Sequence, residues 1–315
     1  MYNLSVSPHI HSKFSVTKIM WLVVISLIPI LIASIYFWGL KSLLIEIVSV
    51  VTAISSELFM NLILRKRITI LDGSAVITGL LVAFNMPAGV PLYVPIVASA
   101  FAIIIAKQLF GGLGYNIFNP ALAGRVFVFF AWLPLMTTFY NPILNSKEFI
   151  TSATPLGISK LQGFDALIAK YGTKILLYKD LFIGNIPGCI GETSKLAILI
   201  GALILFATRV ISWHIPFSYI LTVGIVSYIF KQDPIFHILS GGVFLGAFFM
   251  ATDYVTSPIT KKGKIVFGIL CGILTMLLRL KSGMPEGVSF SILFMNALVP
   301  LIDRYFKNRI YGAKR

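Results

Sequence analysis

Four acidic residues, Glu46, Glu57, Asp72 and Asp253, lie within or at the edge of apolar stretches of the sequence. A charged side chain in a bilayer is costly and usually functional, so these acids are candidates for ion or proton passage. Glu46 and Glu57 are eleven residues apart, about three helical turns, and would share one helix face. The alternative for these two is interfacial snorkelling or a structural pair, whereas Asp72 and Asp253 stand at expected helix breaks.

A second cluster of polar and aromatic residues lies in the glycine-rich stretch 111–125. Asn116 and Asn119 carry donors and acceptors suited to the polar edge of a heterocycle, and Tyr115 and Phe118 offer rings that stack on its face. Irregular backbone of this kind survives at membrane depth only where protein buries it or a cavity receives it. From the residues alone, a tight helix start explains the same stretch.

A third candidate is Thr154, in the stretch Thr151-Ser-Ala-Thr-Pro-Leu156. Pro155 favours an extended conformation for the residue before it, which would present the Thr154 hydroxyl outward. Without family knowledge, an ordinary Ser/Thr turn or helix start explains this stretch equally.

The composition places these residues in a membrane protein. The 315 residues are 57% hydrophobic and 12% charged, with a mean hydropathy of +0.92, far more apolar than soluble domains. The net charge of +15 comes from Lys and Arg spread between apolar runs, which indicates membrane topology and not nucleic-acid binding. Cys189 and Cys271 are too few for a cysteine-ligated iron–sulfur cluster within the chain, although an iron shared with a partner subunit is compatible with them.

The apolar runs predict an all-α polytopic protein of about ten transmembrane helices in the lipid bilayer. The expected helices cover residues 19–38, 42–64, 74–86, 92–110, 120–135, 195–212, 215–230, 235–252, 265–280 and 288–302. The first run is longer than a signal-peptide core and is read as an uncleaved helix. Basic residues at 65–67, 261–264 and 304–315 put both termini in the cytoplasm by the positive-inside rule, which leaves 136–193 outside.

The expected organisation is therefore a first membrane half at 1–135, an extracytoplasmic loop at 136–193 and a second membrane half at 194–315 with a basic cytoplasmic tail. Gly79 and Pro91 of the first half recur as Gly246 and Pro258 of the second. Two five-helix halves would cross the membrane in opposite directions, as inverted repeats do in many transporters. The alternative is chance agreement, since helix ends favour both residues. The third and eighth helices look short and broken by glycine, which points to a binding site.

Four motifs resemble those of a known family, that of RnfD in the ion-translocating Rnf electron-transport complex and NqrB in the sodium-pumping NADH:quinone reductase. The motifs are Asp72-Gly-Ser-Ala-Val-Ile-Thr-Gly-Leu-Leu, Phe110-Gly-Gly-Leu-Gly-Tyr-Asn-Ile-Phe-Asn-Pro-Ala-Leu-Ala-Gly-Arg125, Thr151-Ser-Ala-Thr-Pro-Leu156 and Met250-Ala-Thr-Asp253. Together they span most of the chain, and its length favours the Rnf branch.

The resemblance implies that Thr154 carries FMN through a phosphoester, installed outside the cytoplasm by a flavin transferase. The family pattern often has Gly where this chain has Ser152, while Ala153 and Thr154 match. The resemblance also implies a second, non-covalent flavin, riboflavin, which we assign to the 111–119 block with Asn116 and Asn119 as polar contacts. It further links acids at the positions of Asp72 and Asp253 to cation movement.

The resulting expectation is a membrane flavoprotein subunit of a ferredoxin:NAD⁺ oxidoreductase that couples electron transfer to Na⁺ or H⁺ export. Electrons would arrive from a neighbouring flavoprotein subunit on the outer side, pass to FMN on Thr154 and move on to the second flavin. The chain has no dinucleotide-binding fingerprint of its own. Two alternatives are a flavin-free secondary transporter or channel, and an NqrB-type subunit with the same cofactors and other partners.

Overall fold

The computed structural model describes residues 15–142 and 150–307, and within them the protein is all-helical without β-strands. Parts of both predicted cytoplasmic ends and of the predicted outer loop (1–14, 308–315 and 143–149) lie outside these ranges. Four helices are long and apolar enough to cross a bilayer: α1 (Val16–Trp38), α2 (Leu40–Ile63), α14 (Lys261–Lys281) and α15 (Val288–Tyr305). The predicted class, a multi-pass α-helical membrane protein, is confirmed.

Several apolar helices are shorter than the roughly 20 residues that span a hydrocarbon core. They are α3 (Ser74–Phe84), α4 (Tyr93–Ile103) with its π-helical continuation η2 (Ile104–Gln108), α5 (Pro120–Ala131), α10 (Lys195–Ala207) and α11 (His214–Ile229). The 11 residues of α3 rise only about 16 Å. This helix therefore ends inside the bundle, as its predicted shortness indicated.

The helix predicted at 235–252 is broken more thoroughly than the sequence suggested. It is divided into α12 (Pro234–Leu239), α13 (Val243–Leu245) and the π-helical η4 (Gly246–Met250). The break contains Gly241, whose φ of +62° is a left-handed conformation that glycine adopts without steric cost. The helix predicted at 120–135 also ends early, at Ala131, and Pro134 lies in the first turn of a separate short helix, α6 (Leu133–Thr137).

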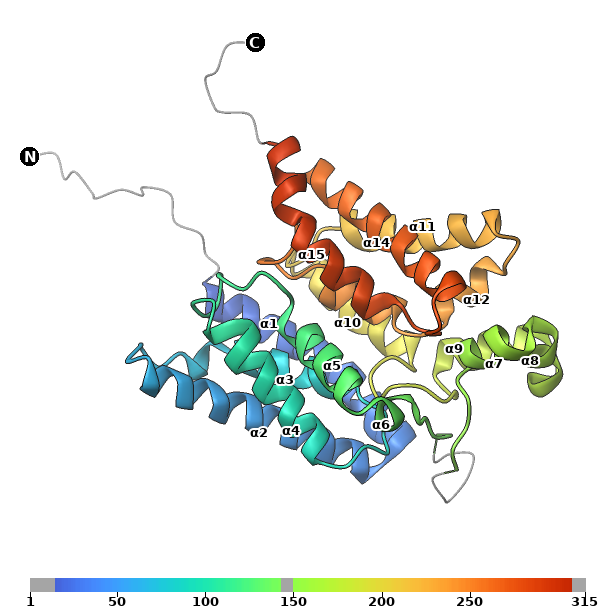
Figure 1. The fold of residues 1–315 in the computed structure, drawn as a ribbon, viewed down its shortest axis with the longest axis horizontal. Helices are drawn as coiled ribbons and strands as arrows, with labels where there is room; N and C mark the ends of the chain where they lie inside the picture. Colours follow the sequence, from blue (N-terminus) through green and yellow to red (C-terminus); the bar gives the residue numbers. More distant parts are fainter. Residues whose placement is uncertain (1–14, 143–149, 308–315) are drawn as a thin grey trace, which may run out of the picture.

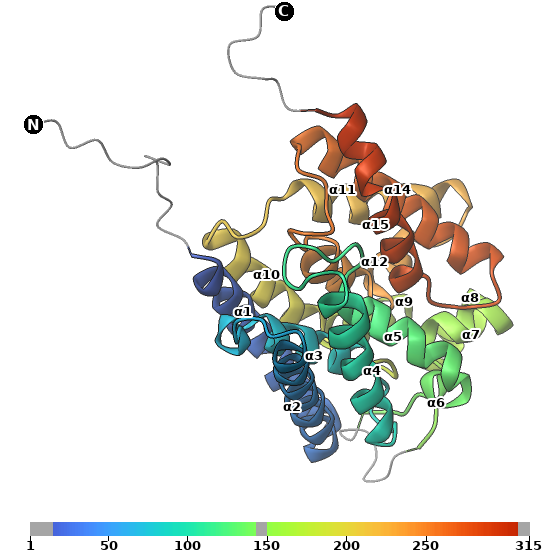
Figure 2. The same ribbon diagram turned by 60° about the vertical axis from the view of Figure 1, so that its left-hand side comes forward.

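The helices form two packed groups (Figures 1 and 2). In one group α2 packs on α3 and α4, and α4 packs on α5; in the other, α11 packs on α14, which packs on α15. The contact of α1 with α10 and that of α5 with α15 join the groups. Sites between the groups are therefore framed by elements from distant parts of the sequence.

Three short helices, α7 (Pro155–Gln162), α8 (Phe164–Tyr171) and α9 (Lys174–Ile183), lie together at one end of the bundle (Figure 1). They share a small apolar core with Phe236 of α12. Tyr178 Oη donates to Asp233 Oδ2 at 2.5 Å. Burial, followed by this hydrogen bond, raises the pKa of Tyr178, so the phenol stays a neutral donor over the usual pH range. The bond fixes α9 to the start of α12.

Lys160 of α7 provides a second attachment of these helices. Its Nζ donates to Arg279 O at 2.8 Å and Met284 O at 2.9 Å, and also to Ser282 O. A cation at a helix C-terminus satisfies carbonyls that have no partner within the helix and interacts favourably with the helix dipole. Both ends of the segment α7 to α9 are thus fixed to the second group of helices.

The contact between α1 and α10 depends on Gly201. A Cβ atom at this position would overlap Ser26 O of α1 and lie 2.9 Å from Phe249 Cζ. Small residues at such crossings allow the close backbone approach that stabilises helix pairs in membranes.

We expect Gly201→Ala to destabilise the protein by about 1–3 kcal/mol, because the added methyl group must push apart two backbones. Thermal unfolding followed by size-exclusion chromatography in detergent measures the effect. Gly283→Ala is the matched control, since a Cβ at Gly283 meets nothing within 4 Å. Equal loss of stability in both variants would contradict the assigned role of Gly201.

Candidate functional site

Thr154 is the N-cap of α7. Its backbone is extended (φ −63°, ψ 154°), as Pro155 predicts, and its Oγ1 accepts a hydrogen bond from Gly157 N at 3.1 Å. The N-terminus of a helix presents free N–H groups and a positive dipole end, both of which favour a negatively charged group. The hydroxyl of Thr154 is therefore well placed to carry an anionic substituent.

Thr154 lines a cavity of about 440 Å³, which includes space open to solvent and is here called the Thr154 cavity. Its charged lining residues are Arg125 of α5, Glu192, Lys195 of α10 and Glu286. Lys195 Nζ donates to Glu192 O at 2.6 Å, and Glu192 Oε1 accepts from Cys189 N at 3.0 Å. The charges on this wall are thus fixed by the loop that precedes α10.

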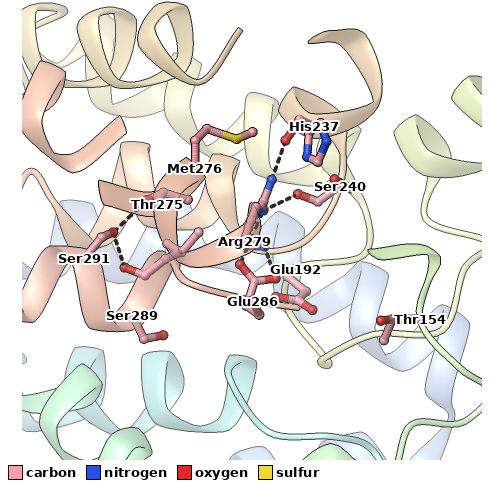
Figure 3. A network of polar contacts seen from close by, with 12 residues as sticks. Thr154, Glu192, His237, Ser240, Thr275, Met276, Arg279, Glu286, Ser289 and Ser291 are labelled. Carbon is pink, nitrogen blue, oxygen red and sulfur yellow. Dashed lines mark hydrogen bonds and ion pairs between the residues drawn. The ribbon is translucent and has the colours of Figure 1, made fainter. Parts of the chain in front are cut away.

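A third buried cation, Arg279, stands behind this wall (Figure 3). It donates to His237 O at 2.7 Å and Ser240 O at 2.9 Å, and pairs with Glu286 Oε1 at 3.4 Å. In Figure 3, Glu286 and Glu192 lie between Arg279 and Thr154. The lining of the cavity itself holds two cations, Arg125 and Lys195, and two carboxylates, Glu192 and Glu286. The two cations offer N–H donors to an anion such as a phosphoryl group.

A larger cavity of about 780 Å³, here called the Asn116 cavity, lies where α3, α5, α1 and η4 meet. Its lining is mainly apolar, with few polar side chains, as is typical of cofactor sites. The polar lining residues are Ser74, Thr78, Lys107, Asn116, Asn119, Thr252, Asp253 and Tyr254.

The structure separates the four residues predicted for a second flavin. Asn116 and Asn119 line the Asn116 cavity, whereas Tyr115 and Phe118 are not among its lining residues and Tyr115 is 72% exposed. Asn119 Oδ1 caps α5 through Ala121 N at 3.1 Å, while its Nδ2 donates to Met250 O at 3.2 Å. The tight helix start is therefore confirmed for Asn119.

Asn116 keeps more capacity for a ligand than Asn119 does. Its Nδ2 donates to Phe118 O at 3.1 Å, and its Oδ1 makes no hydrogen bond within the described residues. A carbonyl oxygen on a cavity wall is suited to accept from a ligand N–H.

The two predicted acids at helix breaks differ in position. Asp253 lines the Asn116 cavity, and its Oδ2 accepts from Thr256 Oγ1 at 3.0 Å. Asp72 is not a lining residue; its Oδ1 accepts from Ser74 N at 2.7 Å and from Ser74 Oγ at 2.5 Å. Asp72 is therefore one hydrogen bond away from the cavity wall.

Glu46 and Glu57 both lie on the buried face of α2, each only 1% exposed, as their spacing predicted. They do not pair with each other: Glu46 Oε1 accepts from Ser34 Oγ at 2.5 Å, and Glu57 Oε2 pairs with Lys107 Nζ at 2.9 Å. The alternative of a structural pair describes Glu57, whose partner is Lys107.

Sequence reasoning missed the buried cations Lys107, Arg125 and Arg279. All three lie within predicted transmembrane runs, so the rule that marked the intramembrane acids would have marked them too. Nothing local in the sequence shows that Arg125 faces Thr154, because 28 residues and a loop separate the two.

The two cavities share α5 as a wall. Ala121 lines the Asn116 cavity and Arg125 lines the Thr154 cavity. Four residues of α-helix correspond to a rise of about 6 Å. The cavities therefore meet α5 at adjacent turns.

Comparison with known proteins agrees with the resemblance in the sequence. A model of the NQR2, RnfD, RnfE family matches residues 3–312. The chain is 46% identical over 315 residues to a component of the Na⁺-translocating ferredoxin:NAD⁺ oxidoreductase complex of Acetobacterium woodii, covering 99% of this chain and 96% of the relative. It is 44% identical over 322 residues to a component of the proton-translocating ferredoxin:NAD⁺ oxidoreductase complex of Clostridium ljungdahlii, covering 100% and 97%. It is also 37% identical over 331 residues to a component of the ion-translocating oxidoreductase complex of Stutzerimonas stutzeri, covering 95% and 93%. The chain belongs to the NQR2, RnfD, RnfE family.

Proposed function

We propose that this chain is the membrane flavoprotein subunit of an ion-translocating ferredoxin:NAD⁺ oxidoreductase complex. It carries FMN as a phosphoester on Thr154 and binds riboflavin in the Asn116 cavity. Electrons pass between the two flavins, and their transfer is coupled to export of Na⁺ or H⁺. Relatives of nearly equal identity are named for Na⁺ and for protons, so the proposal covers both ions.

The observation that carries the proposal is the position of Thr154, an N-cap on the wall of a cavity that two cations also line. A phosphoester there places its negative charge at the N-terminus of α7, with Arg125 and Lys195 on the same wall. Both cations suit phosphoryl oxygens, Arg125 through its planar fork and Lys195 as a point charge. These residues hold the phosphoryl group and orient the flavin.

The Asn116 cavity has a mainly apolar lining with several polar side chains, which suits an isoalloxazine ring. Asn116 Oδ1 accepts from the polar edge of the ring, while Phe248 and Phe249 supply apolar wall. A flavin bound there exchanges one or two electrons. The protein holds it in place and, because both cavities contact α5 at adjacent turns, keeps it close to the flavin on Thr154.

The proposed arrangement in the membrane is ten spans in two inverted halves, 1–135 and 194–315, with Thr154 in the outer segment 136–193. The interrupted elements support it: α3 and α13–η4 occupy corresponding places in the two halves, and each packs on its own half. The basic residues that follow α2 and begin α14 lie at the end of the bundle opposite α7 to α9 (Figure 1). By the positive-inside rule that end faces the cytoplasm.

The remaining functions belong to partners. A flavoprotein subunit on the outer side exchanges electrons with FMN on Thr154, other membrane subunits complete the complex, and a flavin transferase installs the FMN. Sites for ferredoxin and NAD⁺ lie on other subunits. Asp253, on the wall of the Asn116 cavity, and Asp72, one bond from it, are the proposed contacts of this chain with the moving cation.

The rival function is a secondary transporter or channel without flavin, which the interrupted helices would serve as well. It assigns no role to a threonine N-cap in a cavity that Arg125 and Lys195 line. An NqrB-type subunit would share both flavins and differ in its electron acceptor.

We expect in-gel flavin fluorescence of the denatured wild-type protein, co-expressed with a flavin transferase, and its complete loss in Thr154→Ala. Thr173→Ala is the matched control, because it removes the hydroxyl of another N-cap threonine of the same segment, which is exposed and lies outside the Thr151–Leu156 motif. It should remain fluorescent. A dark wild type favours the transporter, and fluorescence that persists in Thr154→Ala places the attachment elsewhere.

We expect Asn116→Leu to weaken riboflavin binding by about tenfold, since a buried acceptor is worth about 1.4 kcal/mol. Riboflavin released by acid from purified Thr154→Ala protein, in which no covalent FMN interferes, measures retention. Tyr115→Leu serves as the control, because Tyr115 lies outside the cavity lining. Riboflavin loss in Tyr115→Leu but not in Asn116→Leu would contradict this placement.

A further inference from the structure

A continuous hydrogen-bonded path leads from the wall of the Asn116 cavity toward the end of the bundle that carries the basic residues. Lys107 Nζ donates to Ser74 Oγ at 2.7 Å, and Ser74 Oγ donates to Asp72 Oδ1 at 2.5 Å. Lys107 and Ser74 line the cavity and are 2% and 5% exposed. Asp72 is half-buried and follows the 83% exposed Leu71. The path thus joins a buried ammonium to a carboxylate near the surface.

Lys107 is held so that one donor remains for the cavity. Its ammonium has three N–H groups, and two of them bind Glu57 and Ser74. Glu57 is fixed in turn by Thr69 Oγ1 at 2.9 Å and Gln108 Nε2 at 3.2 Å. Lys107 lies in η2, a π-helical segment, and such segments occur frequently at functional sites.

We propose that Asp72, Ser74 and Lys107 form a proton relay between the surface and the redox group in the Asn116 cavity. This inference rests on the proposed second flavin. In this relay Lys107 exchanges protons directly with the ring. Ser74 passes protons between Asp72 and Lys107, and Asp72 exchanges protons with water.

Each proton that leaves Lys107 for the ring is replaced from the surface. A Lys107 N–H bond breaks and an N–H bond forms on the ring, which incoming electrons from the proposed transfer chain have made basic. Lys107, left as a neutral amine, takes the Ser74 hydroxyl proton. The Asp72 carboxylate takes a proton from water and passes it to the hydroxyl oxygen, which restores the Ser74 hydroxyl. On oxidation each transfer runs in reverse, and the electrons leave to the next acceptor.

Three carboxylates of the described residues surround Lys107. Glu57 of α2 pairs with it directly, Asp72 of η1 (Ile70–Asp72) reaches it through Ser74, and Asp253 lines the same cavity. Glu57 forms an ion pair with Lys107. Asp253 is bonded to Thr256 and makes no hydrogen bond to Lys107, so the continuous path runs through Ser74.

The test is the rate at which dithionite reduces bound riboflavin, followed by stopped-flow absorbance in full-length Thr154→Ala protein. Riboflavin content is measured first. We expect Ser74→Ala to retain riboflavin and its equilibrium midpoint potential but to be reduced roughly 100-fold more slowly, the scale of a positioned proton donor. Ser74→Thr restores the hydroxyl and the rate. A merely structural Ser74 would change riboflavin content instead.

Asp72→Asn is the second variant, and it leaves the cavity wall intact. It should slow the reduction of riboflavin to a similar extent. If Ser74→Ala loses riboflavin, the reduction rate of Asp72→Asn tests the relay instead. Ser99→Ala removes a buried hydroxyl of α4 outside both cavity linings and is the control. Wild-type rates in Asp72→Asn, or slowing in Asp253→Asn alone, overturn the relay and leave the flavin assignment standing. Wild-type protein without riboflavin overturns both.

Discussion

Every backbone polar group inside the bilayer must find its partner within the protein, and the interrupted helices make this constraint acute. At the C-terminal end of α3, Phe84 O accepts a hydrogen bond from Gly191 N, and Met86 O accepts one from Ile190 N. At the end of η4, Met250 O accepts a hydrogen bond from Asn119 Nδ2. In each case the partner comes from a distant part of the chain. The broken helices therefore hold together the segments that frame both cavities.

The same constraint explains the buried charges. Lys107 pairs with Glu57, and Arg279 with Glu286 and two carbonyls. Removing one partner of such a pair leaves an uncompensated charge, which costs about 3–5 kcal/mol. Each cation is bonded near the start of a helical segment. Lys107 binds Ser74, the first residue of α3, and Arg279 binds the carbonyls of His237 and Ser240, which precede α13. The two cavities open beside these starts, so the groups that stabilise the helix breaks also set the electrostatics of the cavities.

Four features followed from the sequence, because each depends on hydropathy, helical period or one neighbouring residue. They are the membrane class, the shortness of the third helix, the buried face that Glu46 and Glu57 share, and the extended backbone of Thr154. The sequence did not indicate that Asn119 Nδ2 binds Met250 O, or that Arg125 and Thr154 line one cavity. Both depend on how the two groups of helices meet, which no local pattern encodes. The division of the 235–252 helix was underestimated because two adjacent glycines are tolerated in apolar helices and only the tertiary contacts decide whether they bend.

The attachment of Lys160 to the end of α14 also bears on how this family can diverge. Thr154 begins α7, and Lys160 fixes the same helix to carbonyls of the second group of helices. On the other side of Thr154, Asn141 N bonds to Ile150 O and Ser152 N to Phe139 O, so the chain is paired where it enters and leaves the stretch between them. Insertions and deletions between Asn141 and Ile150 can therefore accumulate without displacing Thr154. The few residues from Thr154 to Lys160 have no such freedom, because a change in their number would rotate Thr154 away from its cavity.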